Sequence, residues 1–182
     1  MGETTDTKPS RGDVTKRLSV LTERYISPKN DPRIYWAKEV TFDYSSLSPI
    51  RVDYMEFRPV NNTISGIEHG DVYVYEIKSS VEDFHSKNGH NMIGDYNYYV
   101  MPEEVFEKVK TEIPYAVGVL SPEIFMGTFD STELKSVKRA KRTDRRYPLT
   151  EVLLMMFRSY KRDVEKKERK NGQDLHAESM RL

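Results

Sequence analysis

The stretch VYVYEIKSS, from Val72 to Ser80, decides the expected fold because it combines a strand pattern with a charged end. Valine and tyrosine favour β-strands, and successive side chains of a strand point to opposite faces of its sheet. Val72 and Val74 are therefore expected in the core, on the same face as Glu76 and Lys78. This placement indicates either a chemical site or only the polar end of a core strand.

The segments around this strand predict alternating strands and helices. Upstream, we expect a helix at residues 13–26, capped by Asp13, and a hairpin with strands at residues 36–43 and 50–60. The other expected elements are a short helix at 80–87, a strand at 96–102, a helix at 102–113, a strand at 114–122 and a long helix at 148–170. Residues from 171 onward are expected to fray. This order predicts an α/β domain with a mixed central β-sheet flanked by helices.

The length of the chain favours one domain. Its 182 residues can bury a single core but are too few for two ordinary domains. We expect a flexible arm at residues 1–12, the domain at residues 13–168 and a polar tail at residues 169–182.

Charge and cysteine content exclude several classes of protein. The chain has 29 basic and 29 acidic residues and no cysteine. The lack of cysteine excludes disulfides, thiolate catalysis and cysteine-ligated metal sites, and it favours a reducing compartment such as the cytoplasm. No apolar run approaches the roughly 20 residues that span a bilayer, and the polar start does not resemble a secretory signal, so we expect no membrane association.

Asp53 lies on the expected strand before VYVYEIKSS and completes a candidate constellation. Paired strands lie about 5 Å apart, so Asp53 and Glu76 can approach one hard cation from two sides. Carboxylates of this kind are typical ligands of Mg²⁺ or Mn²⁺. Lys78 would stand beside Glu76, where its charge can orient water or offset charge on a phosphate. These residue types at this spacing suit hydrolysis of a phosphodiester.

The series Asp53, Glu76, Ile77, Lys78 resembles the signature of the PD-(D/E)XK nuclease superfamily. Further segments look like its MmcB-like branch of DNA-repair nucleases over residues 13–160: EV at 39–40, RVD at 51–53, YEIKSSVEDF at 75–84, YNYYVMPEEV at 96–105 and PYAVGVL at 114–120. The resemblance implies a restriction-endonuclease-like core. Two features depart from the pattern: the first motif lacks the proline of the superfamily's name, and a long loop at residues 59–70 separates Asp53 from Glu76.

The resemblance also implies roles for individual residues. Asp53 and Glu76 would hold the metal, the Ile77 carbonyl would complete its shell, and Lys78 would assist catalysis. Such enzymes often add an acidic residue from the first helix or first strand. Glu23 and Glu39 are the matching candidates, and the sequence does not choose between these two or exclude that each is a surface residue.

Several polar residues are candidate DNA contacts. The segment 135–146 carries seven basic residues and one acidic residue, and its members Lys138, Arg139, Lys141 and Arg142 are expected to meet phosphates. Ser80 and Lys87 follow the strand end and would border the site, where Ser80 is also suited to cap a helix. The basic segment has an alternative interpretation as a solvated strand and turn. The sequence also leaves a homodimer open as a possible assembly.

The sequence therefore predicts a Mg²⁺- or Mn²⁺-dependent nuclease that hydrolyses DNA in repair, restriction or phage DNA metabolism. One alternative is a catalytically inactive DNA-binding or assembly module that keeps the nuclease fold. A third class is a protein-interacting factor that uses the charged C-terminal helix.

Overall fold

The computed structural model of the protein describes residues 10–27, 34–43, 46–123 and 133–179, and from residue 170 onward only the backbone. Its centre is a six-stranded sheet with the order β1-β2-β3-β4-β5-β6. The strands are β1 (Tyr35–Phe42), β2 (Ile50–Arg58), β3 (Asp71–Ile77), β4 (Tyr96–Val100), β5 (Gly118–Pro122) and β6 (Leu134–Lys138). The pairs β3–β4 and β4–β5 are parallel, and the other pairs are antiparallel. The expected α/β fold with a mixed central sheet is confirmed.

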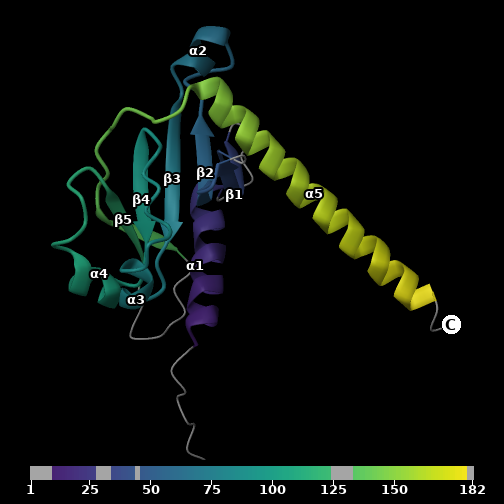
Figure 1. Ribbon diagram of the computed structural model, residues 1–182, viewed down its shortest axis with the longest axis horizontal. Coiled ribbons are helices and arrows are strands. Elements are labelled where there is room, and N and C mark those ends of the chain that lie inside the picture. Colours follow the sequence, from purple (N-terminus) through teal and green to yellow (C-terminus); the bar gives the residue numbers. More distant parts are fainter. Residues whose placement is uncertain (1–9, 28–33, 44–45, 124–132, 180–182) are drawn as a thin grey trace, which may run out of the picture.

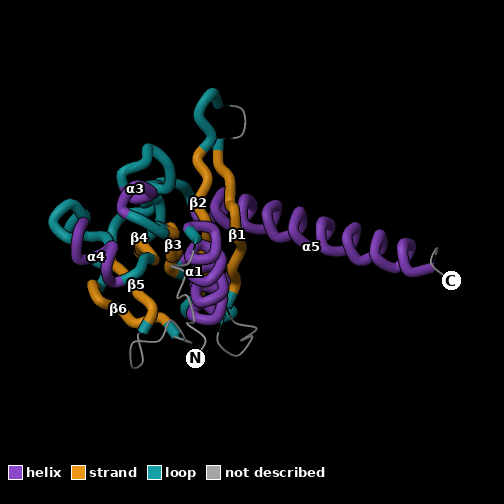
Figure 2. Tube along the Cα trace, turned by 90° about the horizontal axis from the view of Figure 1, so that it is seen from below, coloured by secondary structure: helices purple, strands orange, loops and turns teal. Residues whose placement is uncertain are grey.

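Helices cover both faces of this sheet (Figures 1 and 2). They are α1 (Arg11–Ile26), α2 (Ile64–Glu68), α3 (Val81–Phe84), α4 (Glu103–Val109) and α5 (Leu149–Ser179). Figure 1 shows that α5 packs on the sheet only by its first part and then extends away from the domain. No helix in the described part of the chain combines the length and apolar character that a bilayer span requires.

The observed helices differ from the expected ones in several places. The helices α3 and α4 end at Phe84 and Val109, before the expected ends at residues 87 and 113. Three further differences have a local physical reason. First, α1 begins at Arg11 rather than at residue 13, because Ser10 is the N-cap and its hydroxyl accepts a hydrogen bond from the Asp13 N–H. Second, α2 lies in the loop predicted at residues 59–70, where Thr63 caps it. Third, α5 continues to Ser179, so the fraying predicted from residue 171 is wrong for the backbone. Its Lys, Glu, Arg and Gln residues are good helix formers, which outweigh the single glycine of this segment.

The two faces of the sheet bury separate hydrophobic clusters. On one face, Val152 and Met156 of α5 pack with Met55, Val72 and Val74 of the sheet. On the other face, α1 packs its leucines against the sheet; the buried members there include Leu18, Leu21, Tyr54, Tyr75 and Ile77. A third cluster lies under α3 and α4. Because Val72 and Val74 are buried on the α5 face, strand alternation places Glu76 on that face too, as the sequence predicts.

The regular sheet geometry fails in β1 and β2 beside the strand end at Glu76. Glu39 has a left-handed backbone, with φ of 52°, and no ladder pair joins it to Asp53 across the strands. The pairing of β2 with β3 stops at Tyr54 and Tyr75. Beyond that pair, the Asp53 carboxylate, rather than a backbone carbonyl, accepts the Ile77 N–H at 2.8 Å. A carboxylate thus enters the place where two strands separate.

Candidate active site

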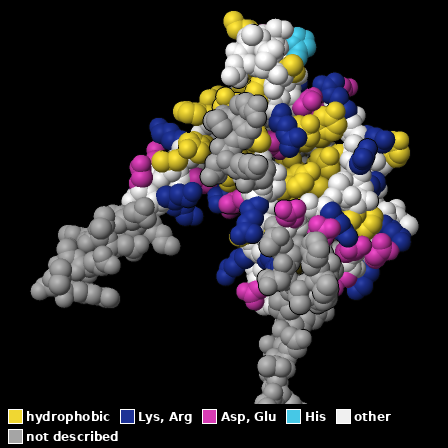
Figure 3. Space-filling view, turned by 180° about the vertical axis from the view of Figure 1, so that it is seen from behind, with side chains coloured by type: hydrophobic (Ala, Val, Ile, Leu, Met, Phe, Trp, Pro, Cys, Tyr) yellow, Lys and Arg dark blue, Asp and Glu magenta, His cyan; other side chains and the backbone are white. Residues whose placement is uncertain are grey.

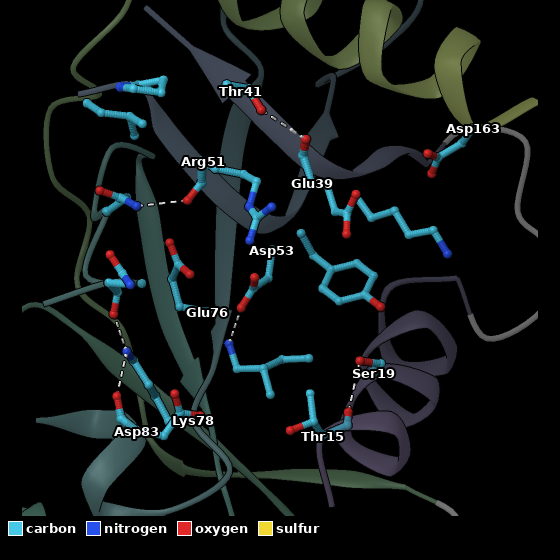
Figure 4. Close-up of a pocket in the computed structure, with 18 of the residues that line it drawn as sticks. Thr15, Ser19, Glu39, Thr41, Arg51, Asp53, Glu76, Lys78, Asp83 and Asp163 are labelled. Carbon is cyan, nitrogen blue, oxygen red and sulfur yellow. Dashed lines mark hydrogen bonds between the residues drawn. The ribbon is translucent and has the colours of Figure 1, made fainter. Parts of the chain in front are cut away.

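An open, polar cleft of about 1310 Å³ lies where β2 and β3 separate. Its walls come from α1, from β1, from α5 and from the segment between α3 and β4. Figure 4 shows residues of α1, β1 and α5 arranged around Asp53 and Glu76. The charged lining residues are Arg11, Glu23, Lys38, Glu39, Arg51, Asp53, Glu76, Lys78, Asp83, Lys87, Asp163, Lys166 and Lys167. The cleft thus brings together all three residues of the predicted triplet, Asp53, Glu76 and Lys78.

Glu76 is buried in the floor of the cleft, and not all of its carboxylate oxygens have a hydrogen-bond partner in the described part of the chain. Its exposed fraction is 1%, and its Oε1 has no hydrogen-bond partner among the described residues. Burial, followed by the negative charge of Asp53, raises the pKa of Glu76 to about 9. An ionised carboxylate in this position requires a positive charge close to its free oxygen.

Asp53 has one oxygen engaged and a carboxyl group that is largely withdrawn from solvent. Its Oδ2 accepts the Ile77 N–H, which fixes the side chain between the strands. Burial raises the pKa of Asp53 despite this hydrogen bond and the nearby positive charges of Arg51 and Lys78. Asp53 and Glu76 line the same cleft, and the negative charge of Asp53 contributes to the raised pKa of Glu76.

Lys78 is 1% exposed, and backbone carbonyls hold its ammonium group. Its Nζ donates to the carbonyl oxygens of Asp83 at 3.2 Å and of Asn88 at 2.5 Å. Burial lowers the pKa of Lys78, whereas the nearby acidic groups oppose that shift. A Cβ atom built on Gly89 would lie 3.0 Å from Lys78 Nζ and 3.2 Å from Glu76 Oε2, so both side chains border this glycine.

The α3 region fixes the surroundings of Lys78. Asp83 accepts hydrogen bonds from the backbone and the hydroxyl of Ser79, at 2.9 and 3.0 Å. Its other oxygen pairs with Arg11 of α1 at 2.9 Å. These contacts join the strand end to two helices and restrict the directions in which the Lys78 ammonium group can point.

The chemistry of the floor fits a divalent cation. Asp53 and Glu76 provide two carboxylates, one with a buried oxygen that lacks a partner, and the Ile77 backbone lies beside them in the cleft. Mg²⁺ binds through one or two carboxylates and takes its other ligands from water and phosphate oxygens. Within the described residues, no group of three or more His, Asp or Glu side chains is arranged to hold a metal. Asp53 and Glu76 are the two carboxylates that lie at the floor of the cleft.

Glu23 and Glu39 both line the cleft, but neither forms a three-carboxylate group with Asp53 and Glu76. Glu23 Oε1 accepts hydrogen bonds from Tyr54 Oη at 3.1 Å and Lys38 Nζ at 3.3 Å. The Glu39 side chain is 58% exposed and lies 3.8 Å from an Arg162 nitrogen of α5. The choice between these two acids stays open.

The predicted DNA contacts fall into two groups. Lys87 lines the cleft, whereas Ser80 caps α3 by accepting the Asp83 N–H and does not line it. The four predicted contacts of the 135–146 segment also lie outside the cleft lining: Lys138, Arg139, Lys141 and Arg142. Lys138 Nζ donates to the Pro114 carbonyl at 2.6 Å.

Sequence reasoning named only Glu23 from α1 and missed the other cleft-lining residues of α1 and all those of α5. Arg11, Thr15, Ser19 and Glu23 line it at intervals of four residues, which is one face of a helix. This four-residue spacing of polar side chains could have indicated that one face of the helix lines a polar site. Lys166 and Lys167 of α5 carried no comparable signal, because the sequence around them is charged on every side.

Comparisons with known proteins bear on the fold. A solved structure of a protein of unknown function from Silicibacter pomeroyi is similar to this chain, with a TM-score of 0.55 and 18% sequence identity. The likeness covers 90% of this chain and 93% of that one, and at this identity it shows a shared fold alone. No family model matches the chain, and no curated protein matches it.

Proposed function

We propose that this protein is a metal-dependent nuclease that hydrolyses DNA phosphodiester bonds at the Asp53–Glu76–Lys78 cleft. The observation that carries the proposal is the buried Glu76 oxygen without a partner, beside a second carboxylate in an open cleft. The resemblance of these residues to the PD-(D/E)XK signature supports the same function and a restriction-endonuclease-like core. The absence of cysteine fits action in the reducing cytoplasm.

Each residue has a distinct task in this proposal. Asp53 and Glu76 would hold Mg²⁺ or Mn²⁺, with the Ile77 carbonyl as a further ligand. The bound ion supplies Lewis-acid chemistry, which activates water and offsets charge on the phosphate. Because the pKa of Glu76 is raised to about 9, its carboxyl group carries a proton at neutral pH in the absence of a cation and releases it when one binds. Lys78 provides a fixed positive charge beside Glu76 for the charge that develops on the phosphate.

A second candidate is a DNA-binding or assembly module that keeps this fold without turnover. One observation favours it: the Lys78 ammonium group is engaged by two backbone carbonyls rather than free in the cleft. The described residues also provide two carboxylates, not a group of three. Under this alternative, the cleft would bind DNA with no hydrolysis.

A cleavage assay separates the two candidates. The protein is incubated with supercoiled, linear, single-stranded and branched DNA in Mg²⁺, Mn²⁺ or EDTA. We expect cleavage that requires the cation and that falls at least 100-fold in Glu76→Gln, Asp53→Asn and Lys78→Met, because each change removes a ligand or a positive charge at the reacting phosphate.

Glu82→Gln is the matched control, because Glu82 is exposed, lies only six residues from Glu76 and does not line the cleft. This variant should cleave at the wild-type rate. Circular dichroism of each variant checks that the fold persists. Cleavage that continues undiminished in Glu76→Gln, or no cleavage of any substrate, would contradict catalysis at this cleft.

A further inference from the structure

Four basic side chains of the cleft have no ion-pair partner among the described residues. They are Arg51 of β2, Lys87 of the segment after α3, and Lys166 and Lys167 of α5. The other basic residues of the lining are engaged: Arg11 pairs with Asp83, and Lys38 pairs with Glu23. Lys78 is bound by carbonyls. The four unpaired residues therefore provide the positive charge that is available to an anionic ligand.

The pairing pattern within α5 singles out two adjacent lysines. Lys161 and Arg169 both pair with Glu165, at 4.0 and 3.7 Å. Lys166 and Lys167 lie between these residues, are exposed, and face the cleft. The helix thus neutralises basic side chains on one side and leaves two charges on the side of the candidate active site.

The length and position of α5 place Lys166 and Lys167 beside the path of a polymer that enters the cleft. A helix of 31 residues is about 46 Å long, which exceeds the roughly 34 Å of one turn of duplex DNA. Figure 1 shows that its second half leaves the domain. Because Lys166 and Lys167 stand where the helix passes the cleft, a polymer that enters the cleft meets them beside the acidic floor.

The basic segment favoured by the sequence, residues 135–146, lies outside the cleft lining, and most of its basic residues are engaged. Arg139 and Lys141 have no ion-pair partner among the described residues, but they too lie outside the cleft. Arg142 pairs with Asp71 at 3.2 Å, and Lys138 donates to backbone carbonyls of Ile113 and Pro114. The chain as a whole has no net charge. On the face seen from behind in Figure 3, the described basic and acidic side chains are intermixed. Affinity for an anionic polymer must therefore come from a local arrangement of charge.

We propose that α5 is a DNA-binding arm, in which Lys166 and Lys167 contact phosphates next to the one that lies at Asp53 and Glu76. Arg51 and Lys87 contact the same backbone from the other walls of the cleft. This inference rests on the proposed function for its ligand, DNA, but not on catalysis. The 135–146 segment makes no contact with the bound DNA.

Fluorescence anisotropy with a labelled 30-base-pair duplex in EDTA tests this arm without cleavage. The full-length protein is titrated at several salt concentrations. Lys166→Gln with Lys167→Gln should weaken binding about tenfold and lower the slope of log K against log salt by about 2, because each phosphate contact contributes about 0.9 to that slope. Glutamine keeps the helix propensity of lysine.

Two double variants with the same loss of charge serve as controls. Lys161→Gln with Arg169→Gln lies on the same helix, and Arg139→Gln with Lys141→Gln lies in the basic segment. Both should bind within about twofold of wild type, with an unchanged slope. An equal loss of DNA affinity in the two α5 variants would show that only the total charge of the helix matters. That result would contradict specific phosphate contacts of Lys166 and Lys167. A loss of affinity confined to the Arg139→Gln, Lys141→Gln variant would contradict the proposed DNA-binding arm. An absence of salt-dependent DNA binding by the wild-type protein would contradict it as well.

Failure of the arm and failure of the proposed function give different results. Salt-dependent binding that requires Lys166 and Lys167, together with no cleavage in Mg²⁺ or Mn²⁺, supports the arm and rejects catalysis. Metal-dependent cleavage with unaltered binding in the Lys166 and Lys167 variant supports catalysis and rejects the arm.

Discussion

At the scale of single residues, Glu76 links the stability of the protein to its candidate chemistry. Its raised pKa means that the folded protein binds this proton more tightly than the unfolded chain, where the pKa is near 4.5. Between the two values, folded Glu76 holds more protons, so the free energy of unfolding falls as pH rises from about 4.5 toward 9. The stabilising contribution is complete below pH 4.5 and is lost as pH approaches 9.

We therefore expect Glu76→Gln to become more stable than wild type at alkaline pH in EDTA. Glutamine does not ionise, so the stability difference should grow by about 2 to 3 kcal/mol between pH 6 and pH 8, at about 1.4 kcal/mol per pH unit. Urea unfolding of both proteins at each pH measures this difference. The exposed control Glu82→Gln should run parallel to wild type. A constant difference between Glu76→Gln and wild type would contradict the buried, protonated state of Glu76.

The sequence predicted the face of the sheet on which Glu76 lies, but it did not predict the conformation of Asp53 beside it. Val72 and Val74 share a face with Glu76 by simple alternation, and all three are buried. The break at Glu39 and Asp53 was not predictable in this way, because it depends on how β1, β2 and β3 pair rather than on any residue pattern. Alternation alone places the Asp53 side chain on one face of the sheet. In the structure, its carboxylate instead lies between β2 and β3, where it accepts a hydrogen bond from the Ile77 N–H.

At the scale of elements, the segment between α3 and β4 holds the candidate catalytic groups in place. Asn88 binds the Lys78 ammonium group through its carbonyl, and Gly89 adopts φ of 70° between Lys78 and Glu76. A side chain at Gly89 would be strained in that conformation and would crowd both groups. The glycine allows the backbone to approach the floor of the cleft closely.

Gly89→Ala should therefore destabilise the protein by about 1 to 2 kcal/mol and lower cleavage more than tenfold. Gly12→Ala is the matched control, because a Cβ there would meet only Ser10 Oγ at 3.8 Å and Gly12 lies within α1. That control should be neutral or up to about 1 kcal/mol more stable. Chemical denaturation and the cleavage assay provide both readouts. Equal behaviour of the two variants would rule out close packing at Gly89.

The major elements followed from local patterns, and the minor ones did not. Strands β1 to β5 have clear alternation and were predicted within a few residues. The start of the long helix α5 was predicted within one residue from its helical periodicity, but its end was predicted nine residues too early. The strand β6 was read only as part of a basic segment, because Lys135 and Lys138 hide its alternation. The helix α2 is a single capped turn in a loop, too short for periodicity to reveal.

At the scale of the whole molecule, the cleft depends on elements that are far apart in the chain. Its walls are α1 near the start and α5 near the end, and its floor is the end of β3. The sequence predicted that Asp53, Glu76 and Lys78 would meet, because neighbouring strands carry them. It did not predict that Lys166 and Lys167 would line the same cleft, because their position depends on how α5 packs against β1. The densest run of positive charge was therefore a poor guide to the residues that line the cleft.

The proposed function requires that Asp53 and Glu76 jointly bind a divalent cation. Anomalous diffraction from crystals grown with Mn²⁺ tests it most directly, because the metal is located without any assumption about substrate. We predict one anomalous peak within bonding distance of both carboxylates, including Glu76 Oε1, and loss of this peak in Glu76→Gln. A map with no peak in the cleft, or a peak bound by neither carboxylate, would show that Asp53 and Glu76 do not form a joint cation site.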